Sequence, residues 1–163
     1  FTFAEGPLVT YVHGGGPIGV MVTFDTDVAD KDGFEAYAKD VAMQVAAINP
    51  AYLNAESVPA EIIDKEKEIL AAQIANDPKS KNKPEQIIAK MVEGRIGKYY
   101  KENCLLDQAF VKDGDITVGQ YTENTAKALG GMIKVTGFVR YEKGEGLEKR
   151  EDNFAEEVAS MMK

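Results

Sequence analysis

The sequence has 163 residues, a net charge of −8 and a single cysteine, Cys104. This length fits one domain with a sizeable core. The acidic balance argues against nucleic acid as a partner, because phosphate contacts need a positive surface. One cysteine cannot form an internal disulfide and suits a reducing compartment, here the cytoplasm. No apolar run approaches the roughly 20 residues that cross a membrane, and the start at Phe1 predicts a fragment of a longer protein.

Residues 8–24 are predicted to form a β-hairpin. Two runs rich in β-branched and aromatic residues flank the glycine and proline cluster at 14–17. The second run alternates so that four apolar side chains share one face: Ile18, Val20, Val22 and Phe24. Because a slip of one residue would move this whole row into water, the alternation fixes the register of the strand.

A helix is predicted over 34–48, and we expect it to pack across the hairpin. Apolar residues recur there at helical spacing. Asp32 and Glu35 have the spacing of a capping box at the start of the helix, and Asn49-Pro50 ends the run. Many residues of the inner face are alanines, so the helix can approach a sheet closely.

Two further helices, at about 60–76 and 84–99, are predicted to form an antiparallel helical arm. Each carries a narrow isoleucine-containing stripe among Glu and Lys residues, and a polar loop joins them. Ser57 is a candidate cap for the first helix, and Pro84 suits the first position of the second. The large amount of charge around so thin a stripe indicates an arm, at about 58–104, that projects from the body of the domain.

The next part of the chain supplies a short helix and a third strand. After a mixed segment at 105–114, Thr117 and Gln120 form a capping-box pattern that opens a helix. Gly130-Gly131 ends that helix. Residues 133–142 then alternate like a strand, with one predicted face formed by Val135, Gly137, Val139 and Tyr141.

The predicted fold class is therefore α+β, with two layers in one domain over 1–163. A small three-stranded antiparallel sheet is expected under a cover of helices, with the antiparallel helical hairpin inserted between the second and third strands. A last helix is predicted at about 152–162, where Asn153 and Glu156 have capping-box spacing.

Two catalytic patterns match the glycine turn, and neither has its required context. Gly14, Gly16 and Gly19 satisfy G-x-G-x-x-G, but a dinucleotide site needs a helix after the glycines, and here a strand follows. His13 and the next three glycines match the oxyanion loop of lipases, yet no serine lies in G-x-S-x-G and no second histidine could act as the base. One His and one Cys cannot build a zinc site. We therefore expect a binding protein without catalytic residues, metal or cofactor, in which Cys104 packs as a small apolar residue.

The order of several short motifs resembles that of a known family. These motifs run collinearly over almost the whole sequence: Tyr11-Val-His-Gly-Gly-Gly16, Ala42-Met-Gln-Val-Ala-Ala47, Ile87-Ile-Ala-Lys-Met-Val-Glu-Gly-Arg95, Gln108-Ala-Phe-Val111, Thr117-Val-Gly-Gln120 and Val135-Thr-Gly-Phe-Val-Arg-Tyr-Glu-Lys-Gly-Glu-Gly146. Met-Val-Glu-Gly-Arg and Gly-Glu-Gly are fairly specific together. The sequence is thus similar to the C-terminal part of bacterial elongation factor Ts, the nucleotide-exchange factor of elongation factor Tu.

The resemblance implies a three-stranded antiparallel sheet with helices packed on it and a projecting helical hairpin. It implies a protein that is not an enzyme, but that binds the GTPase, loosens its magnesium and phosphate contacts and lets GDP leave. The family's N-terminal helical domain and the first half of its core have no counterpart here, so we expect this fragment to supply docking more than exchange. The family's contact with the GTPase maps onto His13, Gly14, Gly15, Phe110, Val111 and Lys112.

A second hypothesis remains open, in which the chain is a structural module that pairs with a second copy of itself. The helical arm and the sheet face that carries Met21 would form that contact, without exchange activity. Phe110 and Val111 have their own alternative, ordinary core packing, which the sequence does not separate from partner contact. For His13 the alternative is a histidine that only hydrogen-bonds its own turn.

Overall fold

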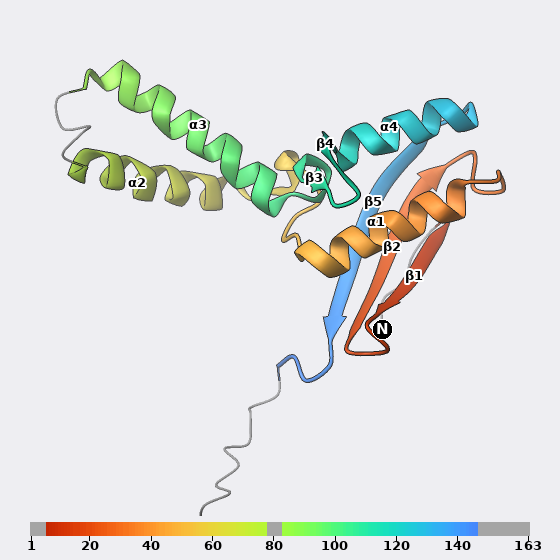
Figure 1. Cartoon of the computed structure of the whole chain (residues 1–163). Helices are drawn as coiled ribbons and strands as arrows, with labels where there is room; N and C mark the ends of the chain where they lie inside the picture. The colour runs from red at the N-terminus through yellow and green to blue at the C-terminus, as the bar shows by residue number, and fades with distance from the viewer. Residues whose placement is uncertain (1–5, 78–82, 147–163) are drawn as a thin grey trace, which may run out of the picture.

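The computed structural model describes residues 6–77 and 83–146. Within these ranges the chain is α+β, as predicted, with one layer of helices on one face of a small sheet and a helical arm beside it (Figure 1). The helix predicted at about 152–162 lies outside the described residues.

The main sheet has three antiparallel strands in the order β1-β2-β5. The strands are β1 (Leu8–His13), β2 (Ile18–Thr26) and β5 (Ile133–Glu142). This confirms the hairpin and the third strand beside it. A second, two-stranded sheet pairs β3 (Ala109–Phe110) with β4 (Asp113–Thr117), where the sequence indicated only a mixed segment.

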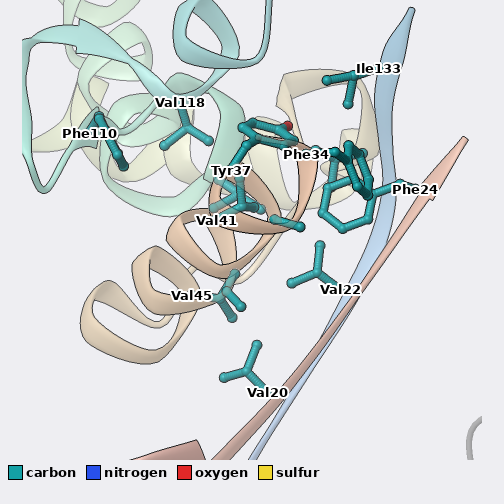
Figure 2. Packing of buried hydrophobic residues seen from close by; sticks show 14 of the residues in the cluster. Val20, Val22, Phe24, Phe34, Tyr37, Val41, Val45, Phe110, Val118 and Ile133 are labelled. Atoms are coloured by element: carbon teal, nitrogen blue, oxygen red, sulfur yellow. The ribbon is translucent and has the colours of Figure 1, made fainter. Parts of the chain in front are cut away.

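The core lies between the sheet and α1 (Phe34–Ile48), which crosses the inner face of β1 and β2. Val20, Val22 and Phe24 are buried there and point from β2 toward the helix (Figure 2), which confirms the predicted alternation. The Phe24 ring meets Phe34 edge-on at a centroid distance of 5.4 Å and lies 5.8 Å from the ring of Tyr37. These aromatic contacts fix the position of α1 over the strand.

The helix α4 (Val118–Leu129) completes the helical layer beside α1. The two helices share a buried hydrogen bond of 2.8 Å between the hydroxyls of Tyr37 and Thr122. Thr122 already donates its proton to the Val118 carbonyl, so the Tyr37 hydroxyl is the donor in this pair. Burial raises the pKa of Tyr37 far above its ordinary value, which keeps the phenol neutral.

One face of β5 differs from the prediction, because a β-bulge at Thr136 reverses the alternation. Val135 pairs with Phe24 on the core side, whereas beyond the bulge it is Phe138 that lies opposite Val22 and packs on the core. Directly opposed residues of antiparallel strands share a face, and an extra residue in one strand shifts that face by one position. The single predicted row was Val135, Gly137, Val139 and Tyr141. Only Val135 of that row faces the core.

The helix starts were predicted with mixed success. Thr117 and Gln120 form the complete capping box of α4, as expected. Asp32 does not cap α1, because the chain enters that helix through Gly33 at φ 101° with no side-chain cap. Ser57 does not cap the next helix either: its hydroxyl donates to the Asn54 side chain at 2.6 Å, inside a separate short turn.

The arm consists of α2 (Ala60–Asn76) and α3 (Glu85–Asn103), which pack on each other and extend away from the sheet (Figure 1). They have their own small apolar cluster, separate from the main core: Val58, Ile63, Leu70, Ile96 and Cys104. Backbone hydrogen bonds from Ala51 and Tyr52 to the Asn103 carbonyl join the base of the arm to the body. The limits of about 58–104 for an inserted arm remain a prediction.

Candidate functional site

The turn between β1 and β2 is formed by glycines that adopt conformations other residues avoid. Gly14, Gly15 and Gly16 have φ values of 63°, 79° and 138°, and the Gly16 amide donates to the His13 carbonyl at 3.3 Å. Positive φ is readily accessible to glycine and rare for other residues. All three are exposed, so the turn presents bare backbone at one end of the sheet.

His13 is the last residue of β1 and is exposed beside this turn. Its Nδ1 lies 3.0 Å from the Tyr11 hydroxyl, within hydrogen-bond distance, and the two rings are tilted with centroids 5.9 Å apart. The imidazole is therefore oriented by a neighbour on the same strand. Its position also fits either of the two roles that the sequence left open.

The segment 109–112 is fixed to the body by several contacts. Phe110 is only 5% exposed and stacks on Tyr121 with centroids 4.3 Å apart. The Val111 amide donates to Gln44 Oε1 at 2.9 Å, while the Val111 side chain is 42% exposed. The segment is thus anchored through its backbone and Phe110, and offers Val111 to the surface.

Lys112, the last predicted contact residue, pairs with α1 of its own chain. Its ammonium lies 2.5 Å from Asp40 Oδ1, and Tyr121 donates to Asp40 Oδ2 at 3.1 Å. Burial, the hydrogen bond with Asp40 and the charge of that carboxylate raise the pKa of Tyr121 to about 12. Asp40 therefore holds both the lysine and the tyrosine on which Phe110 stacks.

The predicted site residues form two groups, the glycine turn with His13 and the segment 109–112. The helix α1 connects the elements that carry them. Its buried face packs on β1 and β2, and its Asp40 and Gln44 hold the segment 109–112. Neither Asp40 nor Gln44 was predicted from the sequence as a site residue. Gln44 carried a signal, since it is a polar residue that falls at helical spacing among the apolar residues Tyr37, Val41 and Val45.

Cys104 follows α3 as its C-terminal cap residue and is buried, as predicted. Burial, with a smaller contribution from Asp107, raises the pKa of its thiol to about 11. Because the thiolate is the nucleophile, we expect alkylation by iodoacetamide at pH 8 to be at least about 100-fold slower in the folded chain than in guanidinium chloride. Its rate should rise with pH up to about 11. Fast labelling of the folded chain at pH 8 would contradict this, and mass spectrometry measures both rates.

Neither a metal site nor a membrane span stands out in the described ranges. No group of three or more His, Cys, Asp or Glu side chains in residues 6–77 and 83–146 could hold a metal ion. None of the helices described there is long and apolar enough to cross a bilayer. Shallow grooves line the arm, one of them bordered by Glu66, Leu70, Arg95 and Tyr99.

Comparison with known proteins identifies the family of this chain. The sequence profile of the family described as Elongation factor TS matches residues 2–145. The elongation factor Ts of Desulforamulus reducens is 53% identical over 163 residues, covering 98% of this chain and 73% of the relative. That of Clostridium botulinum (strain ATCC 19397 / Type A) is 51% identical over 158 residues, covering 97% of this chain and 50% of the relative.

The elongation factor Ts of Clostridium kluyveri is 48% identical over 155 residues, covering 95% of this chain and 49% of the relative. The chain therefore spans about half the length of the Clostridium relatives. A family profile that matches nearly the whole chain, together with identities near one half, establishes the assignment. The chain belongs to the elongation factor Ts family.

Proposed function

We propose that this chain is the part of a guanine-nucleotide exchange factor that docks on elongation factor Tu and promotes GDP release during translation elongation in the cytoplasm. The observation that carries the proposal is the family match over residues 2–145. Because the chain spans about half of its Clostridium relatives, we assign it docking more than exchange. The chain acts as a binding protein on a GTPase and is not itself an enzyme.

The proposed docking surface consists of the glycine turn with His13 and the exposed part of the segment 109–112. His13, Gly14 and Gly15 are exposed, and the two glycines adopt positive φ in the turn. Val111 adds an exposed aliphatic side chain. Phe110 supports this surface from inside, and Lys112 borders it with part of its charge neutralised by Asp40.

The proposal is tested with elongation factor Tu that carries a fluorescent GDP analogue. Titration with this chain should produce a complex, and release of the analogue should be faster than its spontaneous rate, though slower than with a full-length family member. A full-length elongation factor Ts serves as the positive control. If neither binding nor faster release occurs, even when the region that this chain does not cover in its relatives is supplied from a full-length family member, the proposal is wrong.

A second candidate function, self-association, is favoured by the outer face of the sheet. The helices cover one face of the sheet (Figure 1), and the other face carries apolar side chains that the described residues leave exposed or half-buried: Leu8, Val12, Met21, Val139 and Tyr141. Val12 is 64% exposed. Large exposed apolar patches mark interaction surfaces, so this face suits a second copy of the chain.

Light scattering discriminates between the two candidates. A stable dimer that Val12→Lys converts to monomer, and that ignores elongation factor Tu, would favour the structural module. If the wild-type chain is monomeric alone, and if it and Val12→Lys bind elongation factor Tu with the same affinity, self-association is excluded.

A further inference from the structure

Gln44 is a buried polar side chain in an otherwise apolar part of α1. Gln44 is 0% exposed, and its neighbours on the helix belong to the main core: Val41, Ala42, Val45 and Ala46. Burying a carboxamide is unfavourable unless its donors and acceptor all find partners. An apolar residue at this position would avoid that requirement, so the partners of Gln44 indicate what the residue does.

Those partners flank Phe110 on both sides. The Gln44 Nε2 donates to the Ala109 carbonyl at 3.1 Å, and its Oε1 accepts from the Val111 amide at 2.9 Å. A backbone carbonyl and an amide two residues further on are the groups that a neighbouring strand would bind. The side chain of Gln44 therefore takes the place of a strand along β3, whose other edge pairs with β4.

Gln108 extends this network to the base of the arm. Its Oε1 accepts the second hydrogen of Gln44 Nε2 at 3.2 Å, and its own Nε2 donates to the Glu102 carbonyl in the last turn of α3 at 3.0 Å. The carboxamide of Gln44 thus uses both donors and its acceptor inside the protein. A fully satisfied buried network rigidifies the segments that it joins.

We propose that Gln44 is a positioning residue of the docking surface: its carboxamide fixes the backbone of residues 109–111, so that Phe110 stays in the core and Val111 stays available to the partner. This inference rests on the proposed function, since the surface that Gln44 orders is the one assigned to elongation factor Tu. Gln44 itself is fully buried and does not touch the partner.

The test uses Gln44→Met, which keeps an unbranched side chain of similar length and removes all three hydrogen bonds. We expect hydrogen exchange of the Val111 amide to become at least about ten-fold faster and the complex with elongation factor Tu to dissociate about ten-fold faster. Thr122→Val is the matched control, because it removes another buried polar group of the core, whose hydrogen bonds go to Tyr37 and Val118 and not to residues 109–111. It should change neither rate.

A conservative variant supplies a rescue. Gln44→Glu keeps the acceptor oxygen for the Val111 amide, and its neutral carboxyl also regains one donor. Burial favours the neutral form of a carboxyl group, and low pH favours it further. Dissociation of the Gln44→Glu complex should therefore approach the wild-type rate at pH 6 and exceed it at pH 8. If Gln44→Met melts below the assay temperature, the test is the difference between pH 6 and pH 8 in the dissociation rate of Gln44→Glu relative to the wild type, and no difference would contradict the inference.

The outcomes distinguish a failure of the proposed function from a failure of the role assigned to Gln44. If the wild-type chain does not bind elongation factor Tu, the proposed function fails and this inference fails with it. If the wild type binds and Gln44→Met dissociates at the same rate, the inference alone is wrong, whether or not the Val111 amide exchanges faster. Faster exchange together with faster dissociation, both absent from Thr122→Val, supports the positioning role.

Discussion

Phe24→Ala is expected to destabilise the domain by about 3–5 kcal/mol, the range for removing a large aromatic side chain from a core. The Phe24 ring is 1% exposed and lies at the contact between β2 and α1. Its loss leaves a cavity and removes both aromatic contacts, with Phe34 and with Tyr37. Pairs of this kind each contribute about 0.5–1.5 kcal/mol beyond the burial of area. Urea denaturation followed by circular dichroism measures the loss.

Ile69→Ala provides the control for this prediction. Ile69 is an exposed apolar residue of α2, so its truncation should change the free energy of unfolding by less than about 0.5 kcal/mol. A loss below about 1 kcal/mol for Phe24→Ala would mean that the surrounding residues refill the space, contrary to close packing of the core. An unchanged slope with denaturant would show that only the native state was affected.

The fold was predicted where the sequence pattern is local and periodic. Alternation in β2 correctly placed Val20, Val22 and Phe24 in the core, and helical periodicity gave α1 and both helices of the arm. The bulge at Thr136 was missed because strict alternation gives β5 one continuous row from Val135 to Tyr141, and Phe138 is the single apolar residue of the opposite row from Lys134 to Glu142. Only the pairing with β2, more than 100 residues away in the sequence, decides which row is inside.

The start of α1 shows a second limit of local patterns. The spacing of Asp32 and Glu35 satisfies a capping box, but that box needs an extended backbone at the cap position. Gly33 instead enters the helix at φ 101°. A spacing rule states which side chains could reach a backbone amide, whereas the path of the preceding loop determines whether they do.

The sequence predicted which residues belong to the candidate site, but not which of them are exposed. The resemblance pointed to Phe110, Val111 and Lys112 together, yet Phe110 is buried, Val111 is exposed and Lys112 pairs with Asp40. These differences depend on contacts that join residues 109–112 to α1, 72 residues earlier in the case of Lys112. Three neighbours in sequence thus have three different roles in the proposed surface.

His13→Ala is expected to weaken binding to elongation factor Tu by about 30-fold, equivalent to roughly 2 kcal/mol. The imidazole is exposed, and the Tyr11 hydroxyl orients it at the edge of a turn in which three glycines adopt positive φ. A side chain held in one orientation before binding loses less conformational freedom in the complex. Because His13 lies outside the core, the free energy of unfolding should change by less than about 0.5 kcal/mol. Isothermal titration and urea denaturation measure the two effects.

Tyr11→Phe is the matched variant, because it keeps the ring and removes the hydroxyl that lies 3.0 Å from His13 Nδ1. If the imidazole contacts the partner directly, Tyr11→Phe should weaken binding by only about two- to five-fold, since it loosens the orientation of His13 without deleting the contact. Equal losses for both variants would mean that the tyrosine–histidine pair acts only through the shape of the turn. Normal binding with a large drop in the stability of His13→Ala would reverse the assignment and leave His13 as a residue that holds its own turn.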